Sequence, residues 1–213
     1  MSTLRAGATL AWYGSIGELL IAGFAAACGV WVLGLQLGQV AVVATLAWSA
    51  CGLVSALGFV RLSGPEPGGP DTLASREDVH LFARVLCHVL GSVAALCALG
   101  LLAQPVFDVE SLLVVMGVVH VAHAMLVSAL ALAAARYGRD LSERVPDEAC
   151  ARWFALSLTH GTVVVLATAL PAIWLALEHG PEATWLVLIS GPWVWRLCVA
   201  WKLRTLLLGT LTD

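Results

Sequence analysis

Two histidines lie three residues apart in the apolar stretch GVVHVAHAMLV, at His120 and His123. Residues with this spacing share one face of a helix, so both imidazole rings can face the same neighbour. Neutral imidazole binds iron, copper and zinc, and it also accepts and donates protons. The pattern therefore predicts a ligand pair or part of a proton path. We expect both rings to face the protein interior, because rings turned toward lipid would leave their nitrogens without protein partners.

Five more ionisable residues stand within long apolar stretches, at Glu18, Arg84, His88, His160 and Arg196. An ionisable side chain in hydrocarbon is costly, which makes each one a candidate functional residue whose partner must be found. A carboxylate there keeps its proton or pairs with a cation, and Arg196 is the available partner of Glu18 if the first and last helices adjoin. His88 and His160 lie at matched depths, so they are the best pair to ligate a b-type haem.

The composition indicates that these residues lie in a membrane. Of the 213 residues, 60% are hydrophobic and 12% are charged, and the mean hydropathy is +0.92, whereas soluble domains carry about 25% charged residues. A bilayer-spanning helix uses about 20 apolar residues. The sequence therefore predicts an all-α polytopic membrane protein, a six-transmembrane-helix bundle forming a single membrane domain over residues 1–213, with spans at about 9–34, 38–60, 81–103, 110–135, 152–177 and 184–203.

Polar stretches or stretches rich in proline and glycine separate the predicted spans. The segment RLSGPEPGGPDTLASRED is predicted as a loop, in which Ser75 and Asp78 form a capping box for the next helix. The segment RYGRDLSERVPDE is predicted as a polar loop between the fourth and fifth spans.

The basic residues are unevenly distributed over these connections. Nearly all of the 11 Lys and Arg residues lie in or beside the N-terminus, the 61–80 loop, the 136–152 loop or the C-terminus. Basic loops remain on the cytoplasmic side of a membrane. We therefore expect both termini to be cytoplasmic and the protein to reside in the cytoplasmic (inner) membrane. A signal peptide or lipoprotein site is disfavoured, because the first apolar stretch continues past Cys28.

Three stretches, read in order over about residues 10–178, resemble subunit III of haem–copper oxidases and its short relatives associated with nitric oxide reductase. They are GELLIAGFAAA, which places the family's membrane glutamate at Glu18; FDVESLLVVMGVVHVAHAML, with the histidine pair at His120 and His123; and DEACARWFALSL, with Glu148 and Trp153. The chain departs from the family where alanine replaces the valine after the second histidine. It also lacks the tryptophan-histidine-phenylalanine signature of the last helix and has an additional sixth span.

The resemblance implies a non-catalytic subunit of a respiratory complex that binds lipid, packs against a catalytic partner and supports proton uptake. It implies no haem in this chain. Two alternatives come from the residues themselves. One is a b-type haem or metal-binding electron-transfer protein that uses His88, His120, His123 and His160; the other is a small transporter or channel built round Glu18 and the histidines. The sequence holds no nucleotide-binding loop or nucleophile motif, which argues against a self-contained soluble-type enzyme, and no nucleic-acid partner is expected.

Overall fold

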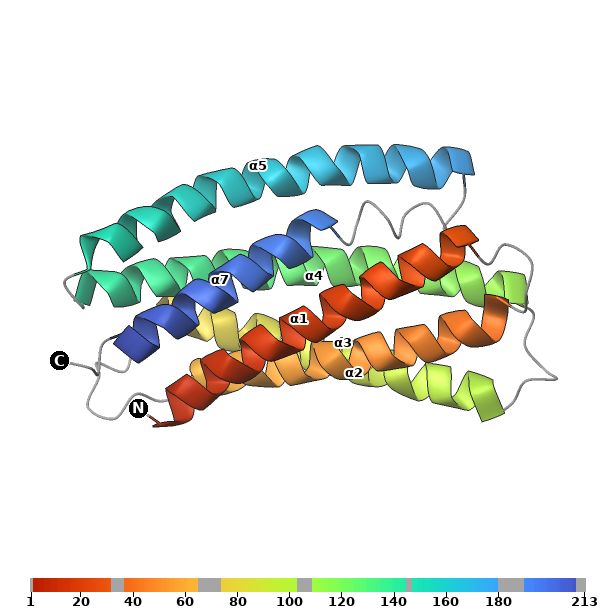
Figure 1. Cartoon of the computed structure of the whole chain (residues 1–213), viewed down its shortest axis with the longest axis horizontal. Coiled ribbons are helices and arrows are strands. Elements are labelled where there is room, and N and C mark those ends of the chain that lie inside the picture. Colours follow the sequence, from red (N-terminus) through yellow and green to blue (C-terminus); the bar gives the residue numbers. More distant parts are fainter. Residues whose placement is uncertain are drawn as a thin grey trace.

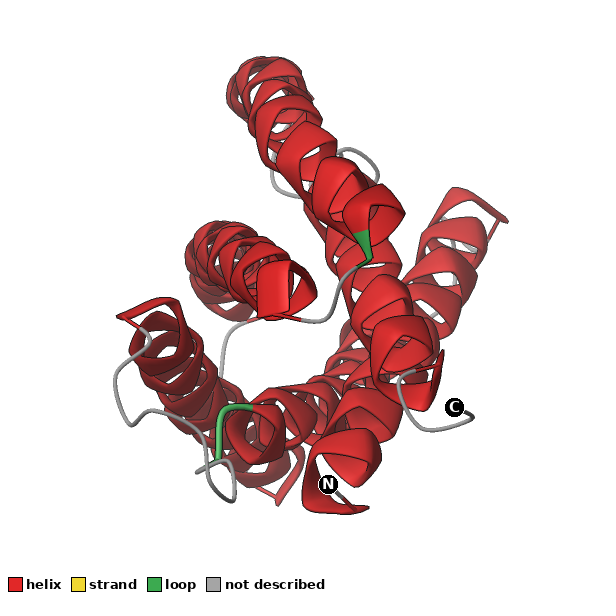
Figure 2. Ribbon diagram, turned by 90° about the vertical axis from the view of Figure 1, so that its left-hand side faces the viewer, coloured by secondary structure: helices red, strands yellow, loops and turns green. Residues whose placement is uncertain are grey.

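The chain folds as a bundle of helices. The computed structural model describes residues 2–31, 37–64, 74–102, 109–144, 147–179 and 190–209, with side chains for 3–24, 43–64, 75–99, 122–144, 147–168, 171, 174 and 191–209. Every regular element in these ranges is an α-helix (Figure 2). The six helices described (Figure 1) are α1 Ser2–Trp31, α2 Leu37–Leu62, α3 Ala74–Leu102, α4 Val109–Arg144, α5 Glu148–His179 and α7 Ser190–Gly209. The predicted all-α class is confirmed.

Three of these helices are long and apolar enough to cross a membrane. Within the described residues, the qualifying segments are Val43–Leu62 of α2, Ser75–Leu99 of α3 and Glu148–Thr168 of α5. Their length and composition support the predicted membrane location. The full set of six spans and the side on which the termini lie remain predictions.

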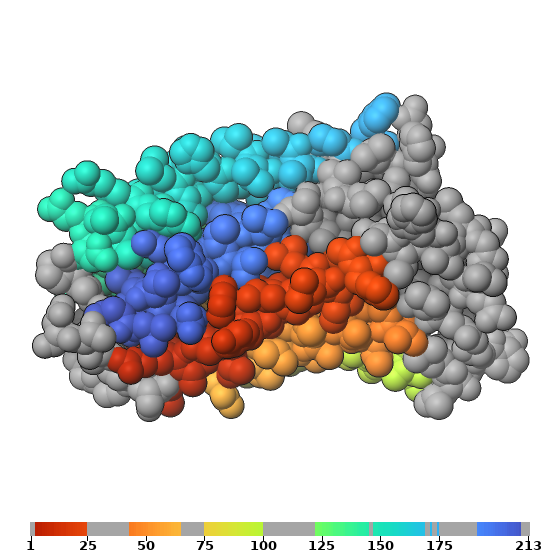
Figure 3. All heavy atoms as spheres, in the orientation of Figure 1, coloured from red at the N-terminus to blue at the C-terminus, as the bar shows by residue number. Residues whose placement is uncertain are grey.

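Five of the helices form a closed ring. Along this ring α1 packs on α2, α2 on α3, α3 on α4, α4 on α7, and α7 back on α1, while α5 packs outside it against α4 and α7. On the face drawn in Figure 3, α1, α7 and α5 lie side by side in that order. The first and last helices are therefore neighbours, and side chains from five helices can meet inside the ring.

The α1–α2 contact is built from small residues. A Cβ atom at Gly58 would meet the backbone of Ala11, and one at Gly7 would lie 2.7 Å from the backbone nitrogen of Leu62. The hydroxyl groups of Ser15 and Ser55 lie 3.1 Å apart across the same contact. Small residues and serine hydroxyls allow membrane helices to approach closely where lipid supplies no hydrophobic driving force.

The predicted loop after the fourth span is wrong for most of its length, because α4 continues to Arg144. Tyr137 and Leu141 lie in the core, and Arg139 pairs with Glu143 one turn later at 3.7 Å. Apolar burial and an ion pair spaced by four residues both favour the helix. α4 ends two residues before Pro146, and the residue that precedes a proline disfavours the helical conformation.

The predicted capping box at the start of the third span is also wrong. Ser75 is the second residue of α3, and its hydroxyl donates a hydrogen bond of 2.5 Å to Asp140 Oδ2 on α4. The serine therefore links two helices instead of capping one.

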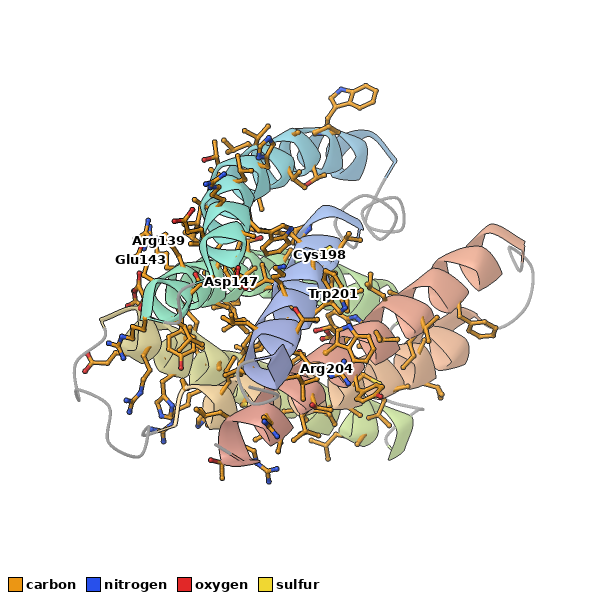
Figure 4. All side chains as sticks on the ribbon, turned by 60° about the vertical axis from the view of Figure 1, so that its left-hand side comes forward. Arg139, Glu143, Asp147, Cys198, Trp201 and Arg204 are labelled. Carbon is orange, nitrogen blue, oxygen red and sulfur yellow. The ribbon has the colours of Figure 1, made fainter. Side chains whose placement is uncertain are left out.

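One end of the bundle collects the basic residues. The start of α1, the end of α2, the start of α3, the end of α4, the start of α5 and the end of α7 all lie at this end (Figure 1). Figure 4 places Arg139, Glu143 and Asp147 together where α4 ends and α5 begins. The residues within or beside these helix ends include Arg5, Arg61, Arg76, Arg144, Arg152 and Arg204. This end is the one predicted to face the cytoplasm.

Candidate functional site

Three ionisable side chains meet inside the ring. Glu18 of α1 pairs through Oε2 with Nη2 of Arg196 on α7, and both side chains are fully buried. The ring of His123, on α4, places Nε2 3.8 Å from Glu18 Oε1 and is also fully buried. The predicted condition for this ion pair, contact between the first and last helices, is met. We refer to Glu18, His123 and Arg196 as the charged cluster.

The space for the carboxylate comes from a glycine on α2. A Cβ atom at Gly52 would meet Glu18 Oε1 and would lie 2.8 Å from Leu90 Cδ1 on α3. Any larger residue at position 52 would have to displace the carboxylate or the leucine. The charged cluster is therefore bounded by all five helices of the ring.

Two tryptophans enclose the imidazole of His123. Its ring stacks on Trp193 at a centroid distance of 5.2 Å and an interplanar angle of 12°. Trp48 lies against the same ring at 4.4 Å, and the two indoles are themselves 5.9 Å apart. Both tryptophans are buried, so Trp193 packs between helices. These contacts fix the plane of the imidazole and surround it with apolar surface.

Sequence reasoning missed Trp48 and Gly52. A usable signal existed, because Trp48 lies in the middle of a predicted span, far from the ends where membrane tryptophans gather. Gly52 follows it by four residues, on the same helix face. Together they indicate a wide aromatic side chain beside a gap on one face of α2.

The charged cluster has more polar atoms than its ion pair uses. Among the described residues, Arg196 Nε and Nη1, and Nε1 of Trp193 beside the His123 ring, are buried without a hydrogen-bond partner. Removing two charges from water costs several kcal/mol per ion, and apolar residues of similar volume often pack at least as well. These buried polar groups therefore make the cluster a candidate functional site.

The other predicted histidines do not join the cluster. His88 on α3 and His160 on α5 are exposed, and each places Nδ1 near the carbonyl oxygen of its own helix, at 2.7 Å from Arg84 and 2.8 Å from Leu156. The side chain of His120 lies outside the described residues, so its shared face with His123 stays a prediction.

The pairing of His88 with His160 as haem ligands stays a prediction. α3, which carries His88, packs on α2 and α4, whereas α5, which carries His160, packs on α4 and α7. In the part of the chain that the structure describes, no group of three or more His, Cys, Asp or Glu residues is placed to hold a metal ion. The charged cluster is the place where the structure brings predicted site residues together, namely Glu18, His123 and Arg196.

No model of a known protein family, no characterised protein and no solved structure matches this chain. The resemblance to oxidase subunit III rests on the three stretches that carry it and stays a prediction.

Proposed function

We propose that this chain is a non-catalytic, six-span subunit of a respiratory or redox complex of the cytoplasmic membrane, in which the charged cluster supports proton uptake by a catalytic partner. The observation that carries the proposal is the complete burial of a carboxylate, an imidazole and a guanidinium where α1, α4 and α7 meet. Ionisable groups inside membrane bundles typically belong to proton relays and ion pathways.

The chemistry of the cluster suits this role. Protonation neutralises the Glu18 carboxylate and charges the His123 imidazole, while the Arg196 guanidinium keeps its charge. Because the two titrating groups lie 3.8 Å apart, a proton bound by one changes the affinity of the other. The cluster can therefore hold one exchangeable proton beside a fixed positive charge.

The helix lengths support six spans. The shortest described helix, α7, has 20 residues, and at about 1.5 Å per residue it reaches about 30 Å, the thickness of the hydrocarbon core. The gathering of basic residues at one end of the bundle supports a cytoplasmic position for that end.

The test begins with a tagged chain purified in mild detergent from its native membranes. We expect it to copurify with a haem-containing partner, and the separated chain to be colourless. A Soret band that stays with the separated chain would favour the haem-protein alternative and overturn the proposal.

The second part of the test measures turnover and proton uptake of that complex with His123→Leu. We expect the subunits to remain assembled while turnover falls several-fold, most strongly at alkaline pH where protons are scarce. The control is His88→Leu, which removes an exposed histidine outside the charged cluster. Equal turnover and uptake in wild type and both variants would refute a proton-uptake role.

A further inference from the structure

A groove lies outside the ring, between α5 and α7. It has a volume of about 620 Å³, and its walls include Leu156 and Val164 from α5 and Val194 and Cys198 from α7. Figure 4 labels Cys198 on the α7 side. The volume falls within the range of about 300–1,000 Å³ that is typical of small-molecule sites.

Two polar side chains interrupt the apolar lining, at Ser157 and His160 of α5. They are three residues apart and so share one helix face. The Nδ1 atom of His160 lies 2.8 Å from the carbonyl oxygen of Leu156. Because a carbonyl oxygen only accepts hydrogen bonds, Nδ1 carries the proton, and Nε2 of the neutral ring is left as an acceptor.

Ser157 provides the complementary group. Its Oγ accepts a hydrogen bond of 2.9 Å from Nε1 of Trp195, so the hydroxyl proton is directed elsewhere. The indole of Trp195 lies against Gly161, where any Cβ atom would collide with it. The groove thus combines apolar and aromatic walls with one hydroxyl donor and one imidazole acceptor on neighbouring turns.

We propose that this groove binds a membrane-soluble hydroquinone, with its flat ring between the walls and one phenolic hydroxyl between Ser157 and His160. A phenolic oxygen accepts from the serine hydroxyl while its own proton is donated to His160 Nε2. A phospholipid ester has acceptors alone and would leave the imidazole unmatched. The inference concerns binding only, and it does not depend on the charged cluster.

The test measures binding of decyl-benzohydroquinone to the chain in lipid nanodiscs, under anaerobic conditions, by titration calorimetry against empty nanodiscs. We expect saturable binding that His160→Leu weakens by about three- to tenfold, the loss typical of one hydrogen bond. His160→Gln keeps an acceptor and should restore part of the affinity. Val164→Trp should fill the groove and abolish binding.

Two controls make the proposal falsifiable. His88→Leu removes a histidine with the same carbonyl contact outside the groove and should leave the affinity unchanged. The dimethyl ether of the probe lacks the phenolic proton and should bind as weakly as the hydroquinone binds His160→Leu. Equal affinity for the ether and the hydroquinone, or no saturation beyond empty nanodiscs, would overturn the proposal.

Discussion

At the scale of single residues, the stability of the ring interior depends on Glu18 and Arg196. Each is fully buried, and each is the other's counter-ion. Removing one partner of a buried ion pair leaves an uncompensated charge, which costs about 3–5 kcal/mol. We therefore expect Glu18→Gln to lower the free energy of unfolding in detergent by about that amount.

The double variant Glu18→Gln/Arg196→Met is the matched comparison, since it removes both charges and keeps similar volumes. It should be more stable than Glu18→Gln alone, because no unpaired guanidinium remains. Additive losses in this double-mutant cycle would show that the two side chains do not interact.

At the scale of elements, the start of α5 is stabilised by Asp147, whose Oδ1 accepts a 2.9 Å hydrogen bond from the backbone N–H of Cys150. This bond lowers the pKa of Asp147 below its ordinary value of 3.8. A carboxyl with a lowered folded-state pKa contributes stability above its unfolded pKa, and the contribution is lost as the pH falls through the folded pKa. Stability should therefore decrease below about pH 4.

Asp147→Asn is the sharp test of this cap, because asparagine also caps helices but does not titrate. We expect it to retain most of the stability at neutral pH and to lose part of the acid dependence, whereas Asp147→Ala should cost about 1 kcal/mol. Unfolding followed by circular dichroism across this pH range measures both effects. An identical acid dependence in wild type and Asp147→Asn would contradict the assignment.

The α1–α2 contact makes a second prediction at this scale. Gly58→Ala places a methyl group against the backbone of Ala11, and overpacking of this kind costs about 1–3 kcal/mol. Gly91→Ala is the control, since a Cβ atom at Gly91 meets nothing within 4 Å and alanine favours the helix. The measurement is the unfolding midpoint in detergent; equal midpoints for the two variants would be inconsistent with close α1–α2 packing.

Sequence patterns predicted where the helices lie along the chain better than they predicted which helices pack together. Long apolar runs identify spans, but the core and the surrounding lipid are equally apolar, so periodicity does not reveal which face of a span meets another helix. The pairing of Glu18 with Arg196 was accessible because few cations lie in the apolar stretches. The contact between the indole of Trp48 and the ring of His123 could not be predicted, because it depends on which helices are neighbours in the bundle. The helical extension to Arg144 was missed because its polar residues are typical of loops.

At the scale of the whole molecule, the bundle's orientation can be tested by cysteine labelling. In a variant whose native cysteines are replaced, we introduce Asp108→Cys or Glu148→Cys. An impermeant maleimide should label position 108 in intact cells and position 148 only after permeabilisation, because basic connections remain cytoplasmic. Asp108 lies outside the described residues, whereas Glu148 begins α5. Labelling of both positions from the same side would refute the six-span topology.

The ion pair between the first and last helices also has a consequence for biosynthesis. Arg196 follows Glu18 by 178 residues, and translation at about 5–20 residues per second separates their synthesis by roughly 10–35 s. During that interval the nascent first helix carries a carboxylate without its cation, so Glu18 must keep its proton or be shielded by the insertion machinery. A polypeptide released before α7 is made retains this defect. Completion of the chain therefore supplies the counter-ion that Glu18 lacks until α7 is made.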